Sequence, residues 1–303
     1  MSYFDLSIPV DSADILRGDE LARVRELITA AFRLGYTCVA LDYRARLPLR
    51  PSDTCRLQCA ALSMGAIIPS IVSDAAISMA AAAPRGVLMS KRDATRLSRK
   101  RQRDGDVAVS NAPRVLSRIT IALESATEGG RFATARSSAA LSPPSSPILS
   151  SWDIIAVEAA DVAGLEAAAG LVDIVSIDMS AAKLPFPISL SLAATVLEKG
   201  TVFELRYAPA IRDIGARRFL IAGARALLMA TRGRGVILAS GGKNALEIRR
   251  PRDAAAIVSL FGLSLEAALI ALSVTPAGVI AHAKKRKNGA IEVIEHAAGS
   301  YST

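Results

Sequence analysis

Histidine, cysteine and aromatic residues are scarce in this chain of 303 residues, which has two histidines, three cysteines and 4% aromatic residues. Both histidines, His282 and His296, follow the last predicted strand, so we expect surface or tail side chains rather than the His-rich cluster of a metal-dependent barrel phosphoesterase. Cys55 and Cys59 form a C-x-x-x-C pair, and Cys38 stands alone, with no histidine near them. This pattern excludes a conventional zinc site, and an odd cysteine count fits a reducing compartment.

Other sequence signals are also missing. No uninterrupted apolar run reaches the roughly 20 residues that cross a bilayer, and the first residues show neither a secretory signal nor an Arg-rich transit peptide. A nucleophile elbow (G-x-S-x-G) and a Walker-type loop are absent. The nearest phosphate-binding candidate is 239–245 (ASGGKNA), where Gly241 and Gly242 could expose backbone amides beside Lys243. A simple glycine turn explains the same residues equally well.

Positive charge is in excess. The formal net charge is +9 and the isoelectric point is about 9.8, which favours a polyanionic partner, with nucleic acid first and an acidic membrane surface second.

Short apolar runs alternate with helical patterns along most of the chain. The predicted strands are 3–8, 36–42, 117–123, 152–157, 172–178, 201–207 and 235–240. The predicted helices between them include 19–35, 164–170, 190–200 and 210–233. Strict alternation of this length predicts an α/β fold of the TIM-barrel type, imperfect because an eighth strand is not evident. Trp152 is expected to anchor the core.

The expected organisation is a single barrel domain over 1–283 followed by a basic and then polar tail over 284–303. Two regions break the alternation: a charge-dense, flexible insertion at about 74–111 and a Ser/Pro loop at 137–150. Extra C-terminal helices are predicted at 250–264, 265–273 and 275–287. Pro251 and Pro276 are placed in first turns, Thr275 as an N-cap and Gly262 as a stop.

Four carboxylates, Asp5, Asp42, Asp178 and Glu204, lie in or just after predicted strands and could face a barrel interior. Because no base partner accompanies them, a structural ion pair such as Glu204 with Arg206 is favoured over catalysis.

Basic residues gather around the last two predicted strands. One cluster is Arg206, Arg212, Arg217, Arg218 and Arg225, and the other is Lys243, Arg249, Arg250 and Arg252. Such clusters fit contacts with a nucleic-acid backbone, although exposed ion pairs with Asp213, Glu247 and Asp253 would be an alternative role.

At these residues the sequence resembles a known family. The segments 172–186 (VDIVSIDMSAAKLPF), 199–213 (KGTVFELRYAPAIRD) and 235–264, preceded in order by FDLSI, LGYTCVALDY, RITIAL and WDIIAVEA, resemble the thirty-kilodalton protein subunit of ribonuclease P and ribonuclease MRP. The resemblance covers most of 3–283. It implies a TIM-barrel-like protein with no catalytic site of its own, with Glu204 as an internal anchor and Arg212 on the outward side.

The function implied is a noncatalytic, RNA-binding subunit of the ribonucleoprotein that removes the 5′ leader of precursor tRNA, shared with the rRNA-processing particle. Its partners would be the ribonuclease P and MRP RNAs and the other protein subunits, with precursor tRNA as the substrate of the holoenzyme. The protein would bind no cofactor, and Mg²⁺ would belong to the RNA. The RNA-binding candidates are Lys183, Arg206, Arg212, Arg217, Arg218, Lys243, Arg249 and Arg250.

Nuclear and nucleolar localisation is the matching expectation. Residues 91–103 pair two basic clusters across a short spacer, as nuclear-import signals do. The residues of that predicted signal are Lys91, Arg92, Arg99, Lys100, Arg101 and Arg103. Two alternatives to the function of a ribonuclease P subunit are an autonomous metal-dependent phosphoesterase and a purely protein-binding scaffold.

Overall fold

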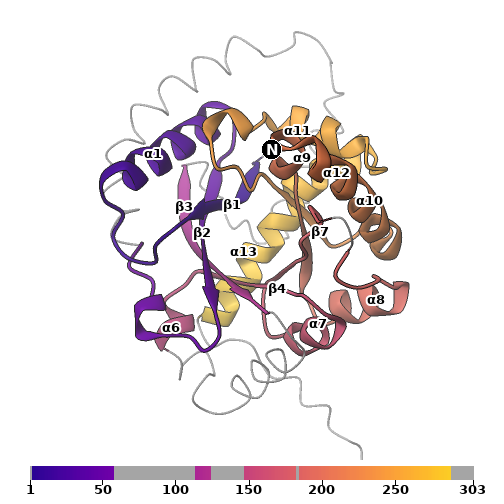
Figure 1. Cartoon of the computed structure of the whole chain (residues 1–303), viewed down its shortest axis with the longest axis horizontal. Helices are drawn as coiled ribbons and strands as arrows, with labels where there is room; N and C mark the ends of the chain where they lie inside the picture. Colours follow the sequence, from indigo (N-terminus) through magenta and orange to yellow (C-terminus); the bar gives the residue numbers. More distant parts are fainter. Residues whose placement is uncertain (1, 58–112, 124–146, 182–183, 288–303) are drawn as a thin grey trace, which may run out of the picture.

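The computed structural model of the chain describes residues 2–57, 113–123, 147–181 and 184–287. Seven strands form one parallel sheet whose order in space is their order in the sequence. They are β1 (Phe4–Val10), β2 (Cys38–Arg46), β3 (Arg114–Ala122), β4 (Ile154–Glu158), β5 (Ile174–Ser176), β6 (Val202–Arg206) and β7 (Val236–Ala239). All seven predicted strands are confirmed, and the curled sheet with its outer helices is a TIM-barrel-like α/β fold (Figure 1).

Helices surround the strands (Figure 1). They are α1 (Gly18–Arg33), α6 (Pro147–Ser150), α7 (Val162–Ala168), α8 (Leu190–Glu198), α9 (Ala208–Arg212), α10 (Ile214–Thr231), α11 (Pro251–Ser259), α12 (Leu265–Leu272) and α13 (Val274–Lys287), with 3-10 turns η1 (Pro51–Asp53) and η2 (Ala245–Glu247). The helix predicted over 210–233 is wrong in one respect, because it is split at Asp213. The backbone of Asp213 is extended, and its carboxylate accepts hydrogen bonds from the N–H groups of Gly215 and Ala216, which starts α10 as a separate helix.

The barrel closes between β1 and β7 with few direct strand contacts. The N–H of Gly241 donates to the carbonyl oxygen of Ser7 at 3.0 Å, and the N–H of Ser240 donates to Oδ1 of Asp5 at 2.9 Å. Beside this seam β1 has an irregular register with β2 between Asp5 and Ile8. A side chain therefore supplies part of the pairing that an eighth strand supplies in a complete barrel.

Apolar side chains form two cores, one on each side of the sheet. The larger lies between strands and helices, and the smaller fills the barrel from Phe4, Leu6, Cys38, Ala40, Ile154, Ala156, Ile174 and Ile237. Asp5 alternates with Phe4 and Leu6 and therefore points to the helix side, so the expectation that it could face the interior is wrong.

Helix α13 covers the amino end of the barrel, where Val279, Ile280 and Ala283 join the interior core. It extends through Lys287, so the domain boundary expected at 283/284 falls inside it. Thr275 lies within this helix, so its prediction as an N-cap is wrong.

A buried carboxylate fastens α13 to the barrel. Nη2 of Arg286, a 1% exposed residue, donates to Oδ2 of Asp173 at 3.0 Å, and Nδ1 of His282 lies 2.8 Å from Oδ1 of the same residue. Burial by itself would raise the pKa of Asp173, but these partners hold it below its ordinary value. The prediction of His282 as a surface or tail side chain misses this contact, and His296 lies outside the described residues.

By length and composition alone, the stretch 265–287 could cross a membrane. The backbone leaves the helical region at Ser273, between α12 and α13. Val279, Ile280 and Ala283 of α13 pack into the barrel, as apolar residues of a core helix do.

Trp152 is fully buried, which confirms its predicted place in the core. Its ring stacks on Tyr43 with centroids 5.7 Å apart, and its indole N–H donates to the carbonyl oxygen of Asp53 at 2.9 Å.

Candidate site at the carboxyl end of the barrel

The carboxyl ends of the strands surround a polar cleft of about 400 Å³. Its charged lining is Asp11, Asp42, Arg44, Glu158, Asp178, Arg206, Arg212 and Lys243. In a parallel barrel all strands end at this face, so polar residues at strand ends that are far apart in sequence converge here. We name this cleft the mouth.

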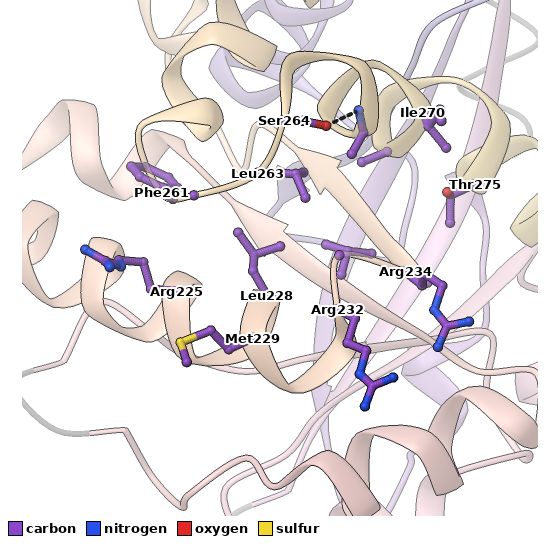
Figure 2. A pocket seen from close by; sticks show the side chains of 16 residues that line it. Arg225, Leu228, Met229, Arg232, Arg234, Phe261, Leu263, Ser264, Ile270 and Thr275 are labelled. Atoms are coloured by element: carbon purple, nitrogen blue, oxygen red, sulfur yellow. Dashed lines mark hydrogen bonds between the residues drawn. The ribbon is translucent and has the colours of Figure 1, made fainter.

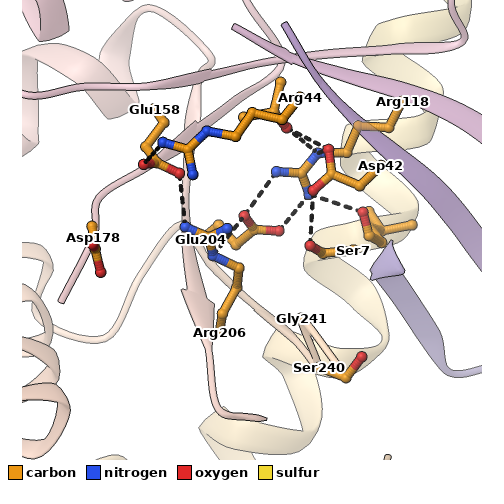
Figure 3. Close-up of polar contacts among 12 residues, drawn as sticks. Ser7, Asp42, Arg44, Arg118, Glu158, Asp178, Glu204, Arg206, Ser240 and Gly241 are labelled. Atoms are coloured by element: carbon orange, nitrogen blue, oxygen red, sulfur yellow. Dashed lines mark hydrogen bonds and ion pairs between the residues drawn. The ribbon is translucent and has the colours of Figure 1, made fainter. Parts of the chain in front are cut away.

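Arg118 of β3 is buried beneath the mouth and joins four strands (Figure 3). Its Nη2 donates to Oε2 of Glu204 at 2.8 Å, and its Nη1 donates to the other oxygen of Glu204 and, at 2.8 Å, to the carbonyl oxygen of Leu6. Its Nε lies 3.3 Å from Oδ1 of Asp42. The prediction that Glu204 is an internal anchor agrees with this geometry. The predicted ion pair with Arg206 is present as a longer contact, with Nε of Arg206 3.9 Å from Oε2 of Glu204.

Burial and the charge of Arg118 act in opposite directions on the pKa values of the carboxylates around it. Burial alone would raise the pKa of Glu204, but the bidentate contact with Arg118 and the nearby Arg206 hold it below its ordinary value. Burial raises the pKa of Asp42, and the charge of Glu204 adds to that rise although Arg118 opposes it. Asp42 also accepts hydrogen bonds from Thr120 Oγ1 at 2.5 Å and Ser7 Oγ at 2.9 Å.

Two further arginines, Arg44 and Arg206, extend this network of ion pairs toward the surface. Glu158 of β4 accepts from Arg44 Nη2 at 2.6 Å and from Arg206 Nη2 at 3.0 Å, one on each oxygen (Figure 3). With Asp42, Glu204 and Arg118 below, three carboxylates face three guanidinium groups. Charge is balanced inside the mouth, which explains how so many ionisable groups can be enclosed.

This arrangement is poorly suited to activating water. A general base or nucleophile needs an available lone pair near the substrate, whereas the oxygens of Glu158 and Glu204 are occupied by arginines. Within the described ranges, no group of three or more His, Cys, Asp and Glu side chains could hold a metal ion.

The turn after β7 is also committed to internal hydrogen bonds. The N–H of Gly241 donates to Ser7, that of Gly242 to Oγ of Ser240 at 3.2 Å, and that of Lys243 to Oε2 of Glu247 at 2.8 Å. The phosphate-cradle interpretation of 239–245 is therefore wrong, and the glycine-turn alternative holds. Gly241 has φ of +61° and would press a side chain against Arg206, which explains glycine at that position.

The predicted RNA-binding residues fall into two groups. Arg206, Arg212 and Arg217 have internal partners. Arg206 is only 24% exposed and binds Glu158, Arg212 makes a two-pronged ion pair with Glu247, and Nε of Arg217 donates to the carbonyl oxygen of Ala210 at 2.7 Å. The other described candidates, Arg218, Lys243, Arg249 and Arg250, have exposed side chains. Lys183 and the predicted import signal at 91–103 lie outside the described residues.

Two buried tyrosines fix the backbone beside Arg249. The hydroxyl of Tyr36 donates to the carbonyl oxygen of Arg249, and the hydroxyl of Tyr207 accepts from its N–H, both at 3.0 Å. Burial raises the pKa of both tyrosines above the ordinary value. Tyr207 directly follows β6 and Arg249 precedes α11, so this lock holds the start of α11 at the carboxyl end of the barrel.

Sequence reasoning missed Arg44 and Arg118. Arg44 is two residues after Asp42 on the same face of β2, so the alternation that singled out Asp42 would have found it. Arg118 is the charged residue in the buried stretch 117–122 of β3, a signal that a buried charge elsewhere must neutralise it.

Fold and site together define a TIM-barrel-like protein whose mouth is braced by buried ion pairs. The sequence profile described as RNase P subunit p30 matches residues 2–288. The chain therefore belongs to the RNase P subunit p30 family.

Each of three individual relatives matches this chain over only about half of its own length. Protein GAMETOPHYTE DEFECTIVE 1 of Arabidopsis thaliana is 28% identical over 296 residues, which cover 95% of this chain and 45% of that protein. Ribonuclease P protein subunit p30 of Mus musculus is 40% identical over 116 residues, covering 38% of this chain and 43% of that protein. Ribonuclease P/MRP protein subunit RPP1 of Saccharomyces cerevisiae is 23% identical over 164 residues, covering 54% and 52%. The chain thus spans about half the length of these relatives.

Proposed function

We propose that this protein is a noncatalytic, RNA-binding subunit of the ribonuclease P ribonucleoprotein, which removes the 5′ leader of precursor tRNA. Family membership supports assembly with ribonuclease P RNA and other protein subunits. The yeast relative is named as a ribonuclease P/MRP subunit, which supports a shared role in the rRNA-processing particle.

One observation carries the noncatalytic part of the proposal. Three carboxylates at the strand ends, where barrel enzymes place their catalytic groups, are engaged here by arginines: Glu158 by Arg44 and Arg206, and Glu204 and Asp42 by Arg118. The RNA subunit would supply the chemistry and would hold the Mg²⁺. An autonomous phosphoesterase is not favoured, because the mouth offers no unpaired carboxylate pair and no visible ligand set among the described residues.

RNA would contact the exposed basic rim around the mouth. Arg249 and Arg250 precede α11, Lys243 follows β7, and Arg218 lies near the start of α10, so all four lie toward the carboxyl end of the barrel. Positively charged side chains that neutralise phosphates release counterions, which makes affinity salt-dependent. Nuclear and nucleolar residence belongs to the same proposal and would place the protein where its RNA partners are made.

The decisive experiment is to purify the tagged full-length protein from cells and sequence the RNA bound to it. Enrichment of ribonuclease P RNA is expected, and its absence under conditions that preserve ribonucleoproteins would refute the proposal. Recombinant protein alone with Mg²⁺ should not cleave precursor tRNA, so robust cleavage without RNA would overturn the noncatalytic role.

The rim can be tested by salt dependence. Replacing Arg249 and Arg250 with Gln should flatten the slope of log affinity against log salt by roughly 0.9 per lost duplex contact, or about 0.7 on single strands. Thermal stability should stay unchanged, since neither side chain has an ion pair in the described part of the chain. Replacing Arg25 and Arg33 of α1 with Gln is the charge-matched control. An equal slope in both double variants would remove the rim from the RNA interface.

A further inference from the structure

A second cleft, of about 640 Å³, lies between α10 and α12 (Figure 2). Its walls are the C-terminal half of α10, the loop 232–235, the residues after α11 and the inner face of α12. Helix α10 begins after the carboxyl end of β6 and ends just before the amino end of β7, so this cleft lies toward the opposite end of the barrel from the basic rim.

Half of the residues that line the cleft carry apolar side chains, among them Leu228, Met229, Leu263 and Ile270. Met229 is 74% exposed and Ile270 is 41% exposed. These two are therefore large apolar side chains that face solvent at the cleft. Exposed apolar surface in a groove is typical of an interaction site.

The charged side chains that line the cleft are all arginines. Arg225, Arg232 and Arg234 stand around the apolar centre (Figure 2), no carboxylate is among the lining residues, and none of the three has an ion pair within the described part of the chain. The loop backbone that carries two of them has a defined conformation: Arg232 caps α10 with φ of +53°, and Gly235 has φ of +61° with no room for a side chain against Leu197. The three arginines thus lie at the border of the groove.

We infer that this cleft receives an amphipathic, acid-flanked helix from another protein subunit of the particle. The inference rests on the proposed function for the existence of that particle. Apolar anchors at helical spacing would enter between α10 and α12, and Glu or Asp beside them would meet Arg225, Arg232 and Arg234. Met and Arg are the residue types enriched at protein interfaces, and both are present here.

Other occupants fit less well. RNA would be expected to stack bases on exposed aromatic rings, whereas the aromatic residue of this lining, Phe261, is only 2% exposed. A second copy of the chain, docked through the same face, would bring two sets of arginines together without carboxylates to neutralise them.

Photo-crosslinking in the assembled particle tests the inference. The replacement Met229→p-benzoylphenylalanine is made in the tagged full-length protein, with Leu246→p-benzoylphenylalanine, exposed near the mouth, as the control. We expect position 229 to crosslink an acidic, amphipathic segment of a co-purifying protein and position 246 not to do so. Crosslinks from 229 to RNA, to a second copy or to the chain's own residues would overturn the inference, as would no crosslink above the control.

A charge-reversal experiment supplies the matching energetic test. The double variant Arg232→Glu and Arg234→Glu should lower recovery of the crosslinked subunit at least about tenfold, and reversal of the facing acids in that subunit should restore it. The charge-matched control is Arg25→Glu with Arg33→Glu on α1. Recovery equal to the control would refute the inference. If the wild-type protein retains ribonuclease P RNA in the same preparations, that failure concerns the cleft and leaves the proposed function intact.

Discussion

Asp5 at the barrel seam is predicted to cost stability at neutral pH, and replacing it with Asn should remove that cost. The side chain is fully buried. Its Oδ1 accepts from the N–H groups of Ser240 at 2.9 Å and Ser7 at 3.4 Å, while its Oδ2 has no hydrogen-bond partner within the described part of the chain. Burial raises its pKa from 3.8 to about 6, and the hydrogen bonds from Ser240 and Ser7 only partly offset that effect.

The sign and size of the effect follow from this pKa. Because the folded protein binds the proton more tightly than the unfolded chain, the folded state is most favoured below pH 3.8 and loses stability as pH rises through about 6. At about 1.36 kcal/mol per pH unit, the total loss is about 3 kcal/mol, of which about 2 kcal/mol falls between pH 4 and pH 8.

Asp5→Asn keeps the acceptor for Ser240 but cannot ionise. Its amide N–H₂ would stand where Oδ2 has no partner, a penalty of about 1 to 3 kcal/mol that does not vary with pH. The informative quantity is therefore the pH dependence of the difference between variant and wild type.

Urea unfolding at intervals from pH 4 to pH 8 measures this difference, with the fluorescence of the single tryptophan, buried Trp152, as the signal. The free energy of unfolding of Asp5→Asn should rise relative to wild type by about 2 kcal/mol across the range. Glu166→Gln, at an exposed site on α7, controls for the loss of a carboxylate. A difference for Asp5→Asn that stays constant over this range would refute the reasoning.

Three further predictions follow from other contacts. Glu204→Gln should lower the free energy of unfolding by about 3 to 5 kcal/mol in urea titrations, because it leaves the buried Arg118 without its charged partner; a loss below about 1 kcal/mol would contradict that role. Asp173→Asn should free Arg286 and accelerate amide hydrogen exchange first in α13, whereas uniform acceleration across the barrel would argue against α13 as a separately fastened element. Deleting residues 91–103 should shift a fluorescent fusion toward the cytoplasm, and an unchanged nuclear signal would deny the segment an import role.

The strands were predictable because most of them contain a short apolar run that is buried on both faces. Residues 152–157 and 235–240, for example, match β4 and β7 with errors of one or two residues at their ends. The split between α9 and α10 was harder to see, since the apolar pattern continues across it. Only the capping chemistry of Asp213 marks the break.

The pairing of charges in the mouth could not be predicted in the same way. Glu204 and Arg206 share one face of β6, which made them the obvious pair from local spacing. The partner in closest contact with Glu204, Arg118, is 86 residues away in sequence and reaches it across the barrel interior from β3. Such a contact depends on the curvature and register of the closed sheet, and neither is encoded in the period of a single strand.

The same ion pairs bear on where this protein can bind. In barrel enzymes the side chains at the strand ends have perturbed pKa values and are free to react with substrate. Here each of Arg44, Arg118 and Arg206 is already paired with a carboxylate. To use Arg118 or Arg206 for an RNA phosphate, the protein would have to expose a buried carboxylate without its partner, at a cost of several kcal/mol. Exposed cations such as Arg250 and Arg232 carry no such cost in the described structure, so binding energy is available only on the outer surface, at the rim around the mouth and at the cleft beside α10.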